Sequence, residues 1–108
     1  VSGTVEDYAV TLDATSAPAG PVTFSITNDG PSEHEFLIVR SDADPASLSV
    51  TAEGIVAEDT IDVVDEIPEW MAGETKSITL DLTAGAYILM CNIEGHYANG
   101  MHVGFTVE

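Results

Sequence analysis

Apolar residues recur at every second position in several short segments of this chain. Residues 22–26 read V-T-F-S-I and residues 78–82 read I-T-L-D-L. A period of two is typical of strands that bury one face, and the 3.6-residue period of an amphipathic helix is hard to find here. Segments rich in turn formers separate the runs: "SAPAGP", "NDGP", "MAGE" and "TAGA". The alternation therefore predicts antiparallel sheets that pack face to face.

The expected strands lie on both sides of one segment that is hard to interpret. Residues 41–72 mix acidic and apolar residues without a sustained period. They predict an irregular excursion with one or two short strands, around Ile55 and at Ile61–Val64. The fold class expected from these runs is an all-β sandwich. Its strands are expected near 4–12, 22–28, 35–40, 76–82, 86–91 and 102–108.

Length and charge limit the number of domains and the kind of partner. With 108 residues and no internal repeat or linker, the chain is expected to form one domain over residues 1–108. Nineteen acidic residues face only Lys76 and Arg40, for a formal net charge of −17. This charge argues against nucleic acid and anionic membranes as partners, and a charged partner should be basic. A surface adapted to salt or to solubility explains the same charge, and the two explanations can coexist.

The sequence offers no sign of insertion into a membrane. No apolar run approaches the roughly 20 residues of a membrane-spanning helix. The N-terminus lacks the charged and then apolar pattern of a signal peptide, so we expect that any leader has already been removed. A membrane tether in a longer precursor stays an open alternative.

Residues that commonly bind metals gather near the C-terminus. Cys91 is the only cysteine, so it cannot form an internal disulfide. His96 follows it by five residues and Met101 follows His96 by five, in a C-x4-H-x4-M pattern between two expected strands. His34, at the start of the strand expected at 35–40, is a fourth donor. Two imidazoles, a thiolate and a weak axial thioether are the ligand set of a blue-copper electron-transfer site.

The remaining histidine and methionines have simpler interpretations. His102 directly follows Met101, so alternation along the strand should point it away from the metal, toward the surface. Met71 and Met90 are expected in the core or at its rim, because methionine often fills gaps in apolar packing.

The order of these motifs resembles the cupredoxins, which are small type 1 blue copper proteins such as plastocyanin and azurin, and in particular the secreted bacterial or archaeal type. The resemblance covers most of the chain: "AGPVTFSITNDG", the histidine of "HEF", a later G-E-T strand, "AGAYILMC" and the Cys-His-Met loop. It implies a Greek-key β-sandwich of about seven or eight strands. The spacing of the loop differs from the shorter loops of plastocyanin and leaves the subfamily open.

The resemblance also implies roles for individual residues. His34, Cys91 and His96 would be equatorial ligands of one copper ion per chain, and Met101 the axial ligand. The backbone amide of Glu35 would donate a hydrogen bond to the cysteine sulfur, which tunes the potential. Asn28 would brace the ligand loop from the neighbouring turn.

The family implies that His96 is partly exposed within an apolar surface where redox partners dock. Pro31, Tyr97, Ala98 and Gly100 would surround it, and Trp70 is either part of that rim or a cover for the core. The implied protein is a monomeric electron carrier in the periplasm or outside the cell, cycling copper between Cu(I) and Cu(II).

Three other functions are alternatives to electron transfer. An enzyme with a second, catalytic copper needs several more imidazoles, and only His102 remains, so we expect no enzyme. A copper carrier or storage protein is the main alternative, although carriers favour Met-rich or His-rich tracts that this chain lacks. Zinc accepts Cys and His but binds thioethers poorly, so a zinc site would leave Met101 unused.

Overall fold

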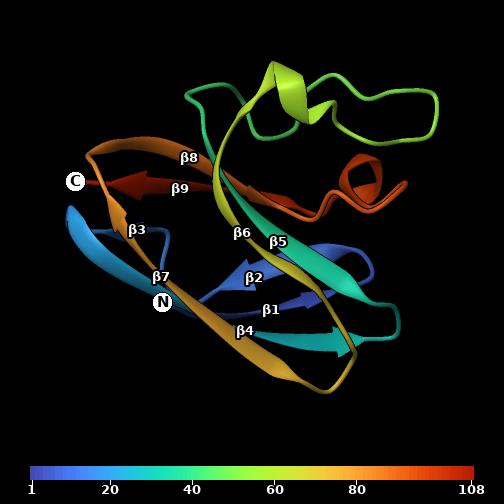
Figure 1. Cartoon of the computed structure of the whole chain (residues 1–108), viewed down its shortest axis with the longest axis horizontal. Coiled ribbons are helices and arrows are strands. Elements are labelled where there is room, and N and C mark those ends of the chain that lie inside the picture. The colour runs from blue at the N-terminus through green and yellow to red at the C-terminus, as the bar shows by residue number, and fades with distance from the viewer.

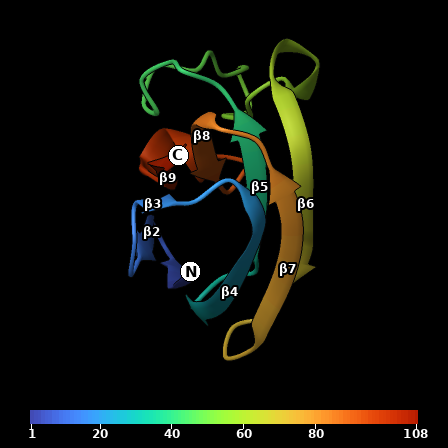
Figure 2. The same ribbon diagram turned by 90° about the vertical axis from the view of Figure 1, so that its left-hand side faces the viewer.

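The computed structural model describes residues 1–108 as nine strands in two sheets. One sheet has the order β2-β1-β4-β7 and the other the order β3-β9-β8-β5-β6; Figures 1 and 2 show the two layers from two sides. The strands are β1 (Ser2–Glu6), β2 (Ala9–Leu12), β3 (Ser16–Ala17), β4 (Gly20–Gly30), β5 (His34–Arg40), β6 (Asp62–Trp70), β7 (Thr75–Leu82), β8 (Gly85–Met90) and β9 (His102–Val107). Two short 3₁₀ helices, η1 (Glu58–Thr60) and η2 (Tyr97–Asn99), lie in the loops.

This sandwich confirms the predicted all-β fold class, with more strands than expected. The segment expected as one strand at 4–12 is a hairpin, in which β1 and β2 pair antiparallel and the chain turns at residues 7–8. Strand β1 also pairs parallel with β4, and β3 pairs parallel with β9. Two pairs of neighbours in the sheets are therefore parallel, and the other pairs are antiparallel.

Strand β6 is the largest departure from the sequence prediction. It spans nine residues, 62–70, where only a short strand at 61–64 was expected. It lies at the edge of its sheet, and most of its residues are exposed, so it has no clean alternation of apolar and polar residues. Pro68 is tolerated because an edge strand leaves backbone donors unpaired. Near Ile55 the structure has only an isolated bridge between Val50 and Val56.

The main core lies between the sheets. Fifteen buried residues form it, and three phenylalanines mark its centre. The Phe24 ring lies 5.7 Å from that of Phe36 and 5.3 Å from that of Phe105, centroid to centroid. Cys91 and Met101 belong to this same cluster. The predicted metal-binding sulfurs are therefore enclosed by the sandwich.

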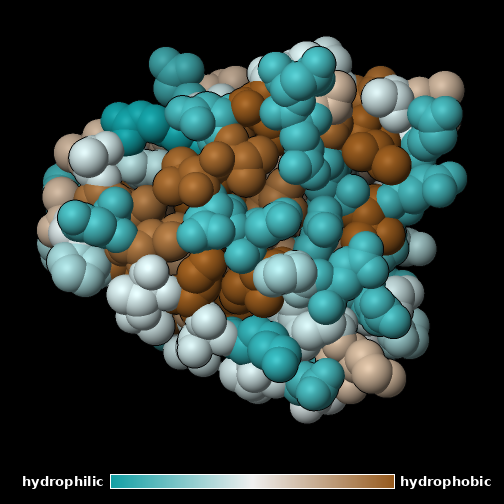
Figure 3. Space-filling view, in the orientation of Figure 1, coloured by the Kyte–Doolittle hydropathy of each residue, from teal (hydrophilic) through white to brown (hydrophobic).

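A second core lies on the outer face of the sheet that contains β5 and β8. Leu37, Val39, Ile88 and Met90 point to this face and pack with Val56 and Tyr97. The excursion at 41–61 thus covers a sheet face that solvent would otherwise reach, which explains why residues 36–39 are all buried. Figure 3 shows apolar residues on the surface interspersed with hydrophilic ones rather than in one continuous patch. The structure contains no helix long and apolar enough to cross a membrane.

Candidate metal centre

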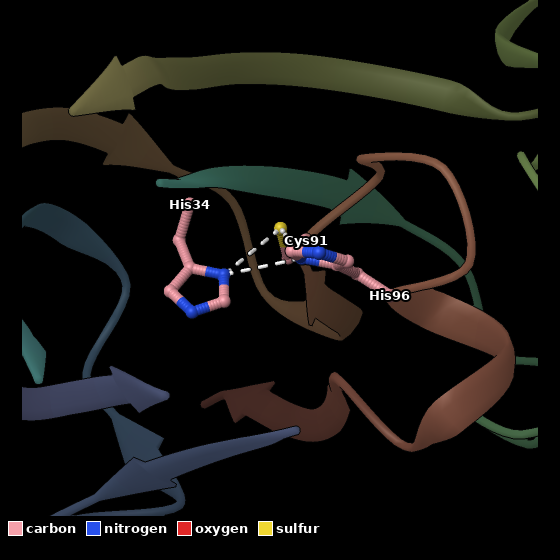
Figure 4. Close-up of side chains that lie close together, drawn as sticks. All are labelled: His34, Cys91 and His96. Carbon is pink, nitrogen blue, oxygen red and sulfur yellow. Dashed lines mark hydrogen bonds between the residues drawn. The ribbon is translucent and has the colours of Figure 1, made fainter. Parts of the chain in front are cut away.

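Three of the four predicted ligands meet at one end of the sandwich. His34 is the first residue of β5, Cys91 directly follows β8, and His96 lies in the loop before η2. The two Nδ1 atoms are 3.2 Å apart. Cys91 Sγ lies 3.7 Å from Nδ1 of His34 and 3.4 Å from Nδ1 of His96. Figure 4 shows both rings turned toward the sulfur.

These separations fit a first-row transition-metal ion. With bonds of about 2.0 Å to nitrogen and about 2.3 Å to sulfur, as in zinc sites, a shared ion needs roughly 3.2 Å between nitrogens and roughly 3.6 Å between nitrogen and sulfur. His34 and Cys91 are fully buried, and His96 is 8% exposed. Buried polar groups normally have hydrogen-bond partners, so three donor atoms that face mainly one another call for an explanation such as a metal ion. The residues therefore fit a metal ion without large rearrangement.

Met101 lies beside this cluster and is fully buried. Its backbone N–H donates to the carbonyl oxygen of His96 at 3.2 Å, and its own carbonyl oxygen accepts from the Cys91 N–H at 3.1 Å. These two bonds close the loop of residues 91–101 into a compact turn. Gly95 and Gly100 have φ of +79° and +116°, a region that favours glycine, and they let the loop reverse direction on each side of His96.

The environment of the thiol combines burial with one directed donor. The Glu35 amide donates to Cys91 Sγ at 3.4 Å, which confirms the contact predicted from the sequence. Burial raises the pKa of Cys91 to about 11, although the amides of Glu35 and Ile93 oppose this shift. Without a metal ion the thiol is therefore protonated at neutral pH. A bound ion must displace that proton.

The Glu35 side chain ties the His34 strand to the ligand loop. Its Oε1 accepts from the Asn92 N–H at 3.1 Å. Burial, together with the charges of Glu66 and Glu58, raises the pKa of Glu35 to about 7. Asn92 in turn bonds to the Val56 backbone and to Glu58, so the excursion is anchored to the loop.

Asn28 is buried, but its hydrogen bonds lie on the His34 side of the site. Its side-chain N–H group donates to the carbonyl oxygens of Ser32 and Trp70 at 3.0 and 2.9 Å. Its Oδ1 accepts from the Gly30 N–H at 2.7 Å. Asn28 therefore shapes the turn that leads into His34, and these contacts do not include the Cys91–Met101 loop that it was expected to brace.

Tyr97, expected at the exposed rim, and Trp70, expected either at that rim or as a cover for the core, are both buried. Tyr97 is buried in the second core, where its hydroxyl contacts Pro45 and Leu48. Trp70 is also buried, and its indole N–H donates to the Glu74 carbonyl oxygen at 2.9 Å, so it covers the core. Pro31 and Ala98 are exposed, in agreement with their expected position at the rim around His96.

Tyr8 and Asp7, from the β1–β2 turn, also reach the site, although the sequence did not predict them there. Tyr8 is 46% exposed and packs edge-on against His96, with ring centroids 5.4 Å apart. Asp7 Oδ1 lies 2.8 Å from Nε2 of His34. No motif could have pointed to either residue, because they are far from the ligands in the chain and only the tertiary fold brings them together.

The other histidine and methionines lie apart from the three donors. His102 is half-buried and packs against the Tyr97 ring at 4.9 Å between centroids. Met90 is buried in the second core, and Met71 is 64% exposed in the turn between β6 and β7. The cluster of potential ligands comprises His34, Cys91 and His96 and does not include His102.

Solved structures of bacterial proteins share this architecture. Reduced auracyanin from Roseiflexus castenholzii matches with a TM-score of 0.75 at 21% identity, over 99% of this chain and 94% of that one. Auracyanin B matches with a TM-score of 0.75 at 25% identity, over 100% of this chain and 87% of that one. Auracyanin A from Chloroflexus aurantiacus, described as a "blue" copper protein, matches with a TM-score of 0.65 at 22% identity, over 100% and 98%.

The sequence alone gives a family assignment that agrees with these folds. No curated protein sequence matches the chain. Residues 14–108, however, match the sulfocyanin (SoxE) domain, which includes every predicted ligand. Together with the sandwich fold, this match confirms the resemblance to the cupredoxins: the chain belongs to the sulfocyanin (SoxE) family.

Proposed function

We propose that this protein is an electron carrier that binds one copper ion through His34, Cys91 and His96, with Met101 as the axial ligand. The observation that carries this proposal is the convergence of two Nδ1 atoms and one sulfur at mutual distances of 3.2–3.7 Å in a buried space. The bound ion supplies the one-electron couple between Cu(I) and Cu(II). Met101 is buried in the same core cluster as Cys91, which supports its axial role.

The chain's own residues would keep the geometry similar in both oxidation states. His34 is fixed by β5, and Cys91 is fixed by the end of β8, which pairs with β5. The loop between Cys91 and Met101 is closed by backbone hydrogen bonds. Donors held this firmly cannot relax far when one electron is added, so little reorganisation accompanies transfer. The Glu35 amide withdraws charge from the sulfur and tunes the potential.

His96 provides the route by which an electron leaves the site. It is the only one of the three donors with measurable exposure, and exposed Tyr8 lies against its ring. Around it we propose a docking surface that consists of Tyr8, Pro31, Met71 and Ala98. All four residues are exposed, and the turns at 30–31 and 71–72 lie in contact.

The partner that we propose is a redox protein with a basic docking face. Exposed acids lie on the segments that adjoin the docking surface: Asp29, Glu33, Glu69, Glu74 and Glu94. A net charge of −17 should accelerate encounters with a cation and make them dependent on salt. We propose a monomer that acts in the periplasm or outside the cell and that catalyses no reaction of its own.

Titration of the metal-free protein with Cu(II) tests this function. We expect one equivalent to bind and to produce an intense thiolate-to-copper absorption band in the visible range, which reduction bleaches reversibly. Cys91→Ser should lose the band, and His102→Gln, outside the cluster, should keep it. Weak absorption with rapid exchange of copper would instead favour a carrier or storage protein.

A further inference from the structure

The nitrogen of His34 that faces away from the other ligands lies beside a carboxylate. Its Nδ1 faces Cys91 and His96, whereas Nε2 is 2.8 Å from Oδ1 of Asp7. Nε2 is fully buried and makes no hydrogen bond of standard geometry. Asp7 supplies a charged acceptor for it, next to the backbone carbonyl of Gly30. The Asp7 side chain is 14% exposed, so water screens this contact only weakly.

Coordination chemistry makes this contact important. A neutral imidazole that binds a metal through Nδ1 carries its proton on Nε2. That N–H is then a buried donor, and burial without an acceptor is unfavourable. A carboxylate is the strongest acceptor that a protein can offer, and a carboxylate behind a ligating histidine fixes the ring and raises its basicity.

The position of Asp7 is itself fixed. The Ser32 hydroxyl donates to its Oδ2 at 2.6 Å, and its own backbone N–H donates to the Gly30 carbonyl oxygen at 3.1 Å. The β1–β2 turn therefore holds this carboxylate behind the ligand.

We propose that Asp7 is a positioning residue of the metal centre, which holds His34 with Nδ1 toward the metal and lowers the reduction potential of bound copper. This inference depends on the proposed copper function. Its direction follows from charge: a nearby anion stabilises Cu(II), the more positive state, more than Cu(I). A positioned carboxylate should have a larger effect than an exposed acid of the same charge.

The first test uses Asp7→Asn, which keeps the shape and removes the charge, with Glu6→Gln as the matched control. Glu6 is the adjacent residue and is exposed. Redox titration should show that Asp7→Asn weakens binding of Cu(II) relative to Cu(I) by at least tenfold, which raises the potential by about 59 mV. Glu6→Gln should change the ratio less than threefold. Equal shifts in the two variants, or a fall in potential for Asp7→Asn, would overturn the proposal.

Two further measurements keep the test decisive. Ser32→Ala removes the hydroxyl that positions the Asp7 carboxylate. It should raise the potential by less than Asp7→Asn does, and it provides a test if Asp7→Asn does not fold. In the metal-free protein, ¹⁵N NMR should show His34 as the Nε2–H tautomer. A wild-type protein with the Nδ1–H tautomer would contradict the positioning role, and this readout does not depend on whether copper gives a blue centre.

Discussion

The two histidines of the metal centre have very different surroundings. His34 begins a central strand, is fully buried and has Asp7 behind it. His96 lies in a loop and is 8% exposed, and its ring packs against the exposed ring of Tyr8. Under the proposed function, the comparison predicts a division of labour: the strand side would fix and tune the metal, and the loop side would connect it to partners.

Removing each imidazole in turn should give the largest contrast. His34→Gly and His96→Gly should both lose the intense band of the copper form, because either change removes an equatorial ligand. Added imidazole should restore the band in His96→Gly, since that space lies beneath the surface. In His34→Gly it should need at least tenfold more imidazole, because the space is closed by β5 and the β1–β2 turn. Absorption titrations measure the imidazole concentration that restores the band in each variant. Equal concentrations for the two variants would contradict the difference in burial between the two sites.

Competition between protons and copper should differ between the Cys91 sulfur and the His34 imidazole. Burial lowers the pKa of His34, and the opposing effect of Asp7 does not cancel this shift, so no proton competes there above neutral pH. Burial instead raises the pKa of Cys91 to about 11, so its thiol must lose a proton when copper binds. Between pH 7 and 9, copper affinity should therefore rise about tenfold per pH unit. Competition with a chelator measures this slope; a flat profile would show that the thiol is already ionised or does not bind.

Glu35 should make the metal-free protein less stable as pH rises. Its folded pKa of about 7 exceeds the ordinary value of 4.5, so the folded state holds the proton more tightly. Stability from this group is fully present below pH 4.5 and is lost as pH rises through 7. Because the carboxyl is only half-buried, the loss is on the order of 1 kcal/mol after solvent screening.

Urea unfolding at pH 5 and pH 7.5 tests this effect in the metal-free protein. Glu35→Gln should weaken the dependence of the free energy of unfolding on pH. Glu33→Gln, which removes an exposed acid from the same turn, should leave most of that dependence in place. If both variants change the dependence equally, repulsion across the whole acidic surface is responsible rather than burial of Glu35.

The sequence predicts those parts of the molecule in which local pattern and tertiary position agree. Strands β4, β7 and β8 alternate or form apolar runs because they bury one or both faces, and their turns carry glycine. The loop from Cys91 to Met101 is found because its donors are close together in the chain. Strand β6 is missed because an exposed edge strand has no apolar period.

Other features depend on long-range packing and leave no local trace. Tyr97 follows a ligand in a loop, so it was expected at the rim. It instead fills the second core, because the excursion at 41–61 supplies an apolar cover, the Pro45 carbonyl oxygen as an acceptor for its hydroxyl and the Leu48 N–H as a donor to it. Asp7 and Tyr8 reach the site only because β1 pairs in parallel with β4 and brings the β1–β2 turn beside Gly30.

The smallest expected effect concerns the docking surface. Tyr8→Ala should slow electron self-exchange between oxidised and reduced copper protein about threefold, because it removes apolar contact beside His96 and leaves the ligands unchanged. Val64→Ala removes a similarly exposed apolar side chain from β6 and should have no effect. NMR line broadening in mixtures of the two redox states gives the rates. Since two chains of charge −17 repel each other, both rates should rise with salt, whereas reaction with a basic protein should slow. Equal rates for Tyr8→Ala and Val64→Ala would show that the electron leaves by another face.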